Sequence, residues 1–410
     1  MRSHGLWLLG LIGCGGPPAA QAQVRPGIEV LLGDSVHLVL GKRLGLLTNQ
    51  TGVDRRGLRD ADLLIARGLS LTALFSPEHG FRGLEDRPGL PDAIDSATHL
   101  PIYSLYGGSR AAARAALDSI DVLLVDLQDI GARYYTYLAS ATSLIRDAAA
   151  RRILILVLDR PNPIGAILVQ GNVRAGLGDP DSNPVGFLPV AMRHGMTLGE
   201  MTRMADDLLG LHANLTVIPV AGWRRGVAYD STGLPWIRPS PNMPSLESAF
   251  HYPGLCLFEG TNLSVGRGTE VAFQLIGAPW LDPPRLLRTL KGAGNGERSA
   301  LVGVEVTDTI FTPRGPTDGK YDGVPLRGVR FRVTDRARYD PTLLAVALLV
   351  ALHAVHPDSF QFRGAGMDRL AAGPELRRAI LAGRSLSDIW RTWSEPLAHF
   401  RRQRAKYLLY

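Results

Sequence analysis

Glu78 is the residue whose type and setting most clearly indicate chemistry. It lies in the segment Ser76 to Gly80, directly after the apolar run Leu71 to Phe75. Pro77 keeps the residue before it extended, and Gly80 permits a tight return of the chain. We expect this turn to hold the Glu78 carboxyl group at a strand end, where it could protonate the leaving oxygen of a glycosidic bond. A surface ion pair is the alternative interpretation of this glutamate.

His79 and Asp126 are the other two candidate catalytic residues. His79 could orient Glu78 or a substrate hydroxyl, and Asp126 could supply a second carboxylate or simply accept hydrogen bonds from backbone amides. With Asp129 they could also bind a metal, but no H-x-x-x-H or C-x-x-C spacing supports such a site. The G-x-S-x-G and S-x-x-K motifs of serine enzymes are missing as well. We therefore predict neither a metal nor a cofactor.

Alternating strands and helices must position these groups. Short runs rich in Val, Ile and Leu are typical of buried strands: Leu44 to Thr48, Leu71 to Phe75, Val122 to Asp126, Ile153 to Asp159 and Leu215 to Val220. Amphipathic patterns between them predict helices: Leu58 to Arg67, Ser109 to Ser119, Tyr137 to Arg151 and Thr197 to Leu208. Thr197 and Glu200 have the spacing of a capping box. The alternation predicts an α/β fold, with a Rossmann-like parallel sheet covered on both faces.

Polar loops follow four of these strands. Because ligands bind where parallel strands end, we expect all four loops to rim one crevice. Side chains suited to contact sugar hydroxyls or rings there are Asn49, Gln50, Gln128, Arg133, Tyr134, Tyr135 and Asn162. No G-x-G-x-x-G motif follows the first strand and no P-loop lysine is present, so the fold does not imply a nucleotide.

The chain changes character from about residue 254. Two predicted strands, Leu301 to Thr307 and Val329 to Thr334, and three predicted helices, Leu343 to His356, Pro374 to Ala382 and Leu386 to Phe400, suggest a second, smaller α+β domain. The preceding segment, Cys256 to Glu270, has the composition of a loop. In it, Glu259 and Glu270 are alternative second carboxylates. Arg267, between two glycines, could pair with a ligand carboxylate.

The composition fits two packed domains. Of 410 residues, 45% are hydrophobic and 20% charged, which allows a large core. The net charge of +7 could attract anionic partners, but general solubility is the simpler interpretation, and no basic run interleaved with aromatics indicates nucleic acid. Cys14 and Cys256 are the only cysteines, so the sequence offers no disulfide framework.

Residues 1–23 are a predicted export signal. Their apolar run, Leu6 to Ile12, is too short to span a bilayer. Leu11 to Cys14 resembles a lipobox, which would lipidate Cys14, whereas Ala20 to Ala22 resembles a cleavage site that would release the protein. We expect an exported protein, periplasmic or extracellular, and either lipid-anchored to a membrane or free. Its Rossmann-like catalytic domain would span residues 24–253, and its smaller C-terminal domain, closing the cleft, residues 254–410.

Several long motifs resemble one family, the NamZ-type exo-β-N-acetylmuramidases. The resemblance is carried by Leu46 to Gly52, Phe75 to Gly83, Asp126 to Tyr137, Asp159 to Pro163, Arg193 to Thr197, Pro239 to Pro244, Phe258 to Glu270 and Lys406 to Tyr410. It covers nearly the whole chain after the export signal. The segment Gly171 to Val190 matches the family's pattern only loosely.

The resemblance implies an activity and a site. It implies a Rossmann-like domain with a smaller domain closing over the cleft, and release of N-acetylmuramic acid from the non-reducing ends of peptide-free peptidoglycan fragments. The family's proposed catalytic glutamate falls on Glu78. The matching motifs also bring Asn242 and Asn262 into the set of candidate substrate-binding residues.

The lactyl carboxylate of N-acetylmuramic acid suggests how the sugar could be selected. Arg133 or Arg267 could pair with it, and neutral N-acetylglucosamine would then leave an arginine unpaired. Two other functions stay open from the sequence. One is a non-catalytic glycan-binding lipoprotein, and the other is a metal-dependent hydrolase or deacetylase using His79 and Asp126.

Overall fold

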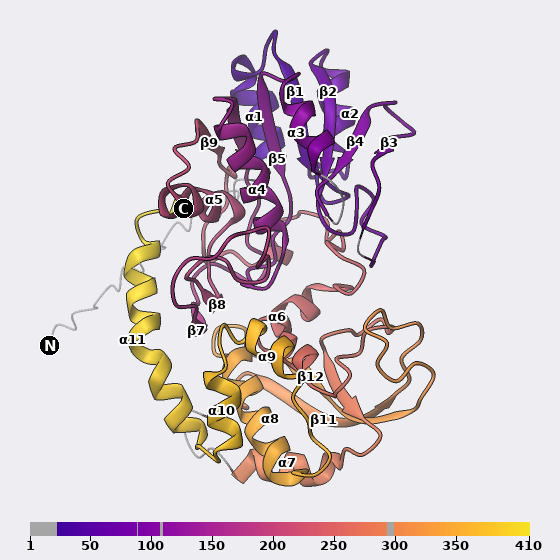
Figure 1. The fold of residues 1–410 in the computed structure, drawn as a ribbon, viewed down its shortest axis with the longest axis vertical. Helices are drawn as coiled ribbons and strands as arrows, with labels where there is room; N and C mark the ends of the chain where they lie inside the picture. Colours follow the sequence, from indigo (N-terminus) through magenta and orange to yellow (C-terminus); the bar gives the residue numbers. More distant parts are fainter. Residues whose placement is uncertain (1–22, 88, 107–109, 293–298) are drawn as a thin grey trace, which may run out of the picture.

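The computed structural model describes residues 23–410, apart from residues 88, 107–109 and 293–298. The chain forms two domains stacked along its long axis, and a long C-terminal helix runs beside both (Figure 1). The predicted export signal, with Cys14, lies outside the described residues except for Gln23. In the part of the chain that is described, no helix is both long and apolar enough to cross a membrane.

A seven-stranded sheet forms the centre of the N-terminal domain. Its order is β3-β4-β2-β1-β5-β6-β9, and every pair of neighbours is parallel except β3 with β4. The strands are β1 (Arg43–Thr48), β2 (Ser70–Ser76), β3 (Ala93–Ile94), β4 (Pro101–Ser104), β5 (Val122–Asp126), β6 (Leu154–Leu158) and β9 (Leu215–Ile218). Without the edge strand β3 this is the Rossmann strand order, so the predicted fold class is confirmed.

Helices cover both faces of this sheet, because alternate strand residues point to opposite sides. Leu44 and Leu46 of β1 pack in a core with α1 and α2, whereas Leu47 packs in a second core with α3, α4 and α5. The helices are α1 (Gly27–Asp34), α2 (Asp60–Ala66), α3 (Ala111–Leu117), α4 (Tyr137–Ala149) and α5 (Leu198–Leu209). The second core continues into the C-terminal domain, so the two domains share buried apolar surface.

The predicted strands and helices of this domain are all present. The capping box is formed, with Thr197 accepting from the Glu200 amide and the Glu200 side chain accepting from the Thr197 amide. The patterns missed α1, β3, β4 and a separate hairpin of β7 (Gln170–Val173) and β8 (Ala191–Arg193). These strands have two to four residues each, too few for alternation to be visible.

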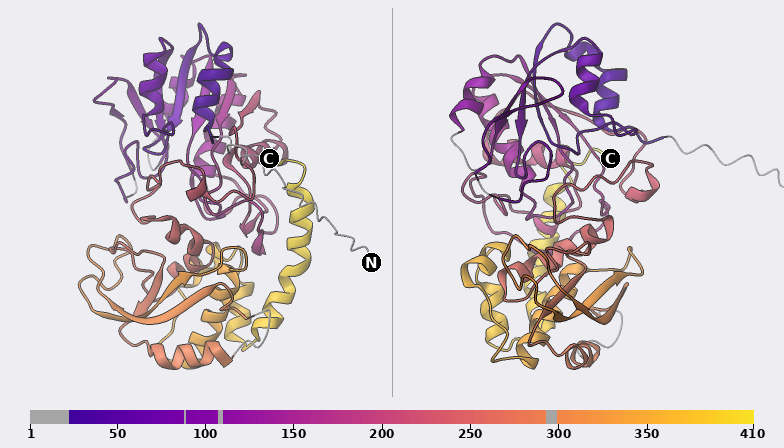
Figure 2. Two further views of the ribbon diagram at one scale, coloured as in Figure 1. Left: turned by 180° about the vertical axis from the view of Figure 1, so that it is seen from behind. Right: turned by 90° about the vertical axis from the view of Figure 1, so that its right-hand side faces the viewer.

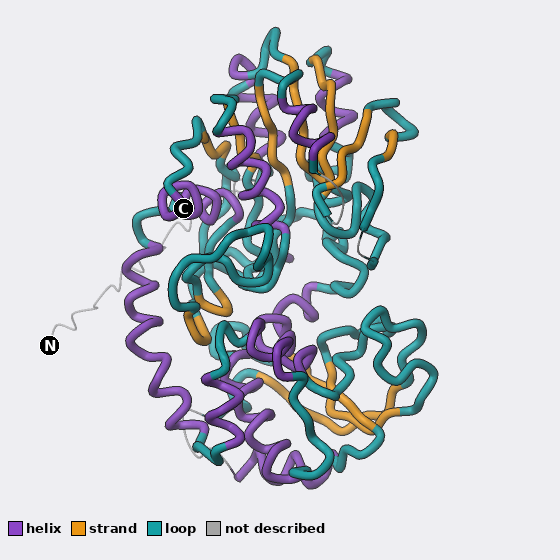
Figure 3. Tube along the Cα trace, viewed as in Figure 1, coloured by secondary structure: helices purple, strands orange, loops and turns teal. Residues whose placement is uncertain are grey.

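The C-terminal domain is built on an antiparallel sheet in the order β10-β12-β11. Figure 3 shows this sheet flanked by helices. The strands are β10 (Leu275–Ala278), β11 (Val304–Phe311) and β12 (Leu326–Val333). The helices are α6 (Leu246–Leu255), α7 (Pro283–Gly292), α8 (Pro341–Val355), α9 (Gly364–Leu370), α10 (Glu375–Leu381) and α11 (Leu386–Arg404). Three short 3₁₀ helices complete the described elements: η1 (Val36–Leu38), η2 (Tyr229–Ser231) and η3 (Cys256–Gly260).

Two features depart from a simple division at residue 253. The predicted boundary falls inside α6, and the chain beyond α11 returns to the N-terminal domain (Figures 1 and 2). There the Tyr410 hydroxyl donates to Asp159 at 2.7 Å, at the end of β6. Burial raises the pKa of the Asp159 carboxyl to about 6, although hydrogen bonds from Thr197, Tyr410 and the Gly199 amide oppose the rise. The last residues of the chain therefore pack against the sheet domain and bind to it.

Candidate active site

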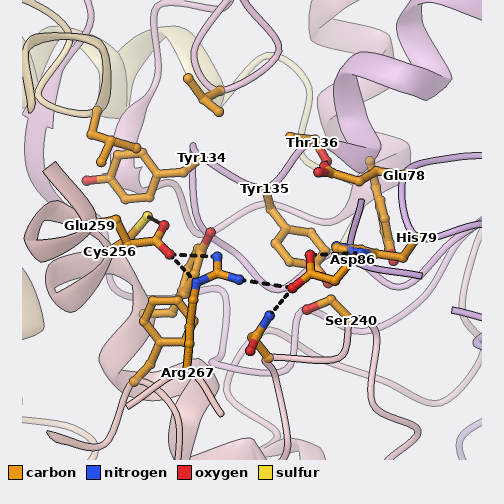
Figure 4. A pocket seen from close by; sticks show the side chains of 16 residues that line it. Glu78, His79, Asp86, Tyr134, Tyr135, Thr136, Ser240, Cys256, Glu259 and Arg267 are labelled. Carbon is orange, nitrogen blue, oxygen red and sulfur yellow. Dashed lines mark hydrogen bonds and ion pairs between the residues drawn. The ribbon is translucent and has the colours of Figure 1, made fainter. Parts of the chain in front are cut away.

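A cavity of about 160 Å³ lies between the two domains (Figure 4). From the sheet domain it is lined by the loops after β2 and β5, and from the other side by α6, η3 and the loop that follows. Its lining residues are Glu78, His79, Asp86, Tyr134, Tyr135, Thr136, Tyr137, Val185, Ser240, Asn242, Tyr252, Cys256, Glu259, Arg267, Phe273 and Leu370. Two of the four loops predicted to share a crevice thus contribute side chains to one cavity.

Glu78 is held by a sharply turned loop. β2 ends at Ser76, and His79 and Gly80 follow with positive φ angles of 69° and 73°. A histidine in the left-handed region is uncommon, and strain of this kind clusters at functional sites. The turn leaves Glu78 half-buried beside the start of α4, where the Thr136 hydroxyl donates to Oε2. Burial, followed by the nearby charge of Glu78, raises the pKa of the Tyr106 hydroxyl.

Asp86 is a second carboxylate on the same loop. Its Oδ2 accepts hydrogen bonds from Asn242 Nδ2 at 2.6 Å and from the Thr317 hydroxyl, and lies 3.4 Å from Arg267 Nη1. Its Oδ1 lies 3.5 Å from His79 Nδ1. That nitrogen is 2.7 Å from the Glu85 carbonyl, which can only accept, so Nδ1 carries a proton. Asp86 therefore joins the sheet domain to residues of the C-terminal domain.

Arg267 lies on the opposite wall. Its Nε donates to Glu259 Oε1 at 2.6 Å, and its guanidinium lies 5.6 Å from the centre of the Phe273 ring. Burial lowers the pKa of the Arg267 guanidinium, but the charge of the Glu259 carboxylate and its hydrogen bond raise it. The net effect is a raised pKa. The flanking Gly266 and Gly268 have φ angles of 80° and 78°, which only glycine adopts at low cost. The predicted feature, an arginine held between two glycines, is thus a tight turn that faces the cavity.

An aromatic wall joins these two ends of the cavity. Tyr252 packs edge to face against Phe273, Tyr135 and Tyr134, with ring centres 4.7, 6.1 and 6.2 Å apart. The Tyr134 hydroxyl donates to the Pro253 carbonyl, so this side chain offers its ring, not its hydroxyl, to the cavity. A wall of aromatic faces with a few charged groups suits the apolar face and polar edges of a sugar.

Seven of the predicted site residues line this cavity: Glu78, His79, Tyr134, Tyr135, Asn242, Glu259 and Arg267. The structure adds Asp86, Thr136, Ser240 and Cys256 to them. Asp86 follows Glu85 in a polar loop eight residues beyond Glu78, and nothing local marks it as facing inward. Ser240 is carried by the segment that also supplies Asn242, a motif that the sequence did single out.

The predicted residues after β1, β5 and β6 lie behind the cavity and hold its loops. Asn49 accepts from the Thr51 amide and hydroxyl. Gln50 donates to the carbonyls of Arg238 and Pro239, next to Ser240. Gln128 donates to the Pro161 carbonyl, and Asn162 to the Met196 carbonyl. These amides satisfy backbone groups and do not line the cavity.

Asp126 is fully buried and bound to Arg160 in a two-point ion pair. Burial, followed by the charge of Asp126, raises the pKa of neighbouring Asp60 well above its ordinary value. Asp126 thus lies in a buried charge cluster outside the cavity lining. Among the described residues, no group of three or more His, Cys, Asp or Glu side chains is arranged to hold a metal ion.

Arg133, Asn262 and Glu270 also lie elsewhere. Arg133 is buried and donates to the carbonyls of Asn172, Val190 and Leu370. Asn262 donates to the Ser359 carbonyl and accepts from the Gln361 amide, so it fixes two loops of the C-terminal domain. Glu270 pairs with Arg238 at the surface, where its side chain is 80% exposed.

A two-domain α/β protein with carboxyl groups, an arginine and aromatic rings in its interdomain cavity has the features of a carbohydrate-active enzyme. Comparisons with known proteins agree. The family models described as exo-β-N-acetylmuramidase NamZ, N-terminal and C-terminal, match residues 44–247 and 250–410. The peptidoglycan β-N-acetylmuramidase NamZ of Bacillus subtilis is 37% identical over 395 residues, 96% of this chain and 92% of that protein.

Solved structures show the same architecture. Two DUF1343 family proteins of Bacteroides fragilis superpose with TM-scores of 0.84 and 0.74, at 32% and 31% identity, covering 95% of this chain and 99% of each of theirs. The chain belongs to the NamZ family of exo-β-N-acetylmuramidases, and it is a glycoside hydrolase. The resemblance seen in its motifs is confirmed.

Replacing Arg133 with methionine should reduce stability. The change removes the arginine donor from the carbonyls of Asn172, Val190 and Leu370, which predicts a loss of about 2–4 kcal/mol in the free energy of unfolding. Equilibrium urea unfolding measures it. Arg114→Met, which removes a surface pair with Asp147, is the matched control and should cost less than about 1 kcal/mol. Equal losses in the two variants would contradict the structural role.

Proposed function

We propose that this enzyme releases N-acetylmuramic acid from the non-reducing ends of peptide-free peptidoglycan fragments, with Glu78 as general acid. The observation that carries the proposal is the position of the Glu78 carboxyl group. It lies in the interdomain cavity and receives a hydrogen bond from Thr136, with an arginine on the opposite wall. The Bacillus subtilis relative is a peptidoglycan β-N-acetylmuramidase, which supports the same substrate class.

Glu78 would act on the bond between the terminal sugar and the rest of the glycan. Its carboxyl proton moves to the glycosidic oxygen as the bond to C1 breaks, which avoids expelling an alkoxide. The Thr136 hydroxyl holds Oε2 and thereby fixes the direction of the carboxyl group. The aromatic wall of Tyr134, Tyr135 and Tyr252 would receive the terminal ring, which suits attack at chain ends.

Glu78→Gln should slow hydrolysis of the natural substrate far more than hydrolysis of a substrate with an activated leaving group. An amide cannot donate the proton, so release of N-acetylmuramic acid from its β-1,4 disaccharide with N-acetylglucosamine should fall about 10²–10⁴-fold. The nitrophenyl β-glycoside, whose leaving group needs little protonation, should lose less. Comparing kcat/KM for the two substrates measures the difference. Equal losses on both would exclude Glu78 as the acid.

Arg267 is the residue that we propose reads the lactyl carboxylate. Its Nε is committed to Glu259, but Nη1 makes only longer contacts, 3.3 Å to Thr317 and 3.4 Å to Asp86. This edge of the guanidinium could therefore bind an anionic group of the substrate. Arg133, by contrast, lies outside the cavity lining, and both of its Nη atoms donate to backbone carbonyls.

Arg267→Lys should weaken the choice between the two amino sugars. Lysine keeps the positive charge but lacks the planar, two-pronged donor of the guanidinium. The ratio of kcat/KM for the nitrophenyl glycosides of N-acetylmuramic acid and N-acetylglucosamine should therefore fall roughly 30-fold, which corresponds to about 2 kcal/mol. Because both substrates are measured with the same preparation of the variant, any loss of folded enzyme cancels in the ratio. An unchanged ratio would show that another group recognises the lactyl side chain.

We also propose that the enzyme is exported, and that its signal lies within residues 1–23. The short apolar run and the lipobox-like Leu11 to Cys14 support this. Mass spectrometry of the mature protein from its native host measures the outcome. A chain beginning at a lipid-modified Cys14 supports anchoring, and a chain beginning at Gln23 supports release. An unprocessed N-terminus would contradict export by this segment.

A further inference from the structure

Asp86 is a carboxylate in the cavity to which the chemistry above gives no task. We propose that it is the second catalytic carboxylate: it binds the 2-acetamido N–H of the terminal sugar and supports attack of the acetamido oxygen on C1. The inference rests on the proposed function and deepens it. It assigns a substrate-assisted mechanism, which needs no enzyme nucleophile.

Asp86 and Glu78 stand in different hydrogen-bonding environments although one loop carries both. Glu78 meets neutral hydroxyl groups, from Thr136 and Tyr106, which can either donate to a carboxyl group or accept from it. Asp86 Oδ2 faces an amide, a hydroxyl and the guanidinium of Arg267. These donors, one of them a cation, anchor the Asp86 carboxylate, so the two carboxyl groups have different partners and suit different roles.

The second oxygen of Asp86 is the one left for a ligand. Oδ1 lies 3.5 Å from His79 Nδ1, too far for a good hydrogen bond, and the proton on that nitrogen is directed to the Glu85 carbonyl. A carboxylate oxygen with spare lone pairs in a cavity calls for an N–H or O–H donor. Figure 4 shows Asp86 between His79 and Arg267, with Tyr135 beside it.

An N-acetylated sugar supplies a matching donor and methyl group. Its amide N–H can reach Oδ1, and its acetyl methyl can pack on the aromatic wall that includes Tyr135 and Tyr252. Three donors on Oδ2 fix the plane of the carboxylate and draw off its charge. A carboxylate anchored in this way is suited to orient the acetamido group and to stabilise positive charge on it. It is less suited to act as a nucleophile that bonds to C1.

The proposed steps balance. In the first, Glu78 gives its proton to the glycosidic oxygen, the C1–O bond breaks toward that oxygen, and the acetamido carbonyl oxygen bonds to C1. The positive charge on the resulting oxazolinium ring is stabilised by its N–H···Asp86 contact. In the second, water attacks C1 and gives a proton to the Glu78 carboxylate. The bond from C1 to the acetamido oxygen breaks, so the amide and the Glu78 acid are restored and the configuration at C1 is retained.

The test compares nitrophenyl β-glycosides of N-acetylmuramic acid whose acetyl group carries none, one, two or three fluorines. Fluorine weakens the acetamido oxygen as a nucleophile, so wild-type kcat should fall about 100-fold or more across the series. The first product of the disaccharide, observed by NMR, should be the β anomer. Asp86→Asn should lower kcat on the unfluorinated substrate about 10²-fold with KM changed only a few-fold.

Matched variants distinguish a catalytic role of Asp86 from a purely structural one, in which Asp86 would act only as a latch that holds the two domains together. Thr317→Val removes one bond to Asp86 across the domains but keeps the carboxylate, and it should lose less than about 10-fold in kcat with the wild-type fluorine dependence. Asp62→Asn removes a surface carboxylate of the same domain and should behave as wild type. If Thr317→Val and Asp86→Asn lose equal activity, Asp86 is only a latch and the proposal fails.

Two further outcomes would overturn it: a wild-type rate independent of fluorine, or an α anomer as first product. Because the fluorine series uses unmodified enzyme, a variant that misfolds does not obscure the result. Failure of the proposed function would look different, since wild-type enzyme would then release no N-acetylmuramic acid from the disaccharide.

Discussion

A half-buried arginine, Arg267, lies between two carboxylates from different domains, and this pairing is the constraint on which the site depends. Arg267 and Glu259 belong to the C-terminal domain, and Asp86 comes from the loop after β2 of the sheet domain. A charge taken out of water must be paired, and removing one partner strands the other. The pairing therefore holds the β2 loop, with Glu78 on it, against the opposite wall. In the proposed mechanism, the contacts that close the cavity also place the acid.

Much of the fold could be predicted because its information is local. The strands β1, β2, β5 and β6 are brief apolar runs, and each ends at a polar loop. Their alternation with helices leaves few topologies other than a parallel sheet covered on both sides. The return of the chain after α11 could not be predicted in this way. Its docking depends on Tyr410 meeting Asp159, 251 residues away.

The site was predictable where a short motif combines a reactive side chain with a turn. Glu78 precedes a positive-φ pair, and Arg267 lies between two positive-φ glycines, so sequence and backbone geometry point to the same residues. Asp126 and Arg133 show the limit. Both are charged residues near a strand end, but Arg160 and a set of distant carbonyls take up their charges. Sequence spacing does not show which charges are neutralised by partners brought in by the fold.

The same limit explains why Asp86 stood out only in three dimensions. Its donors, Asn242, Arg267 and Thr317, follow it by 156 to 231 residues. Long-range partners of this kind anchor the carboxyl group of an ordinary loop aspartate so that it faces the cavity. They also distinguish it from Glu78, eight positions earlier, whose neighbours are hydroxyl groups.

A crystal structure of the Glu78→Gln variant with the uncleaved β-1,4 disaccharide of N-acetylmuramic acid and N-acetylglucosamine would test the central claim most directly. The account predicts the N-acetylmuramic acid ring in the interdomain cavity, with the glycosidic oxygen within hydrogen-bonding distance of the substituted side chain at position 78. A disaccharide bound elsewhere, or one whose glycosidic oxygen faces solvent away from that position, would contradict it.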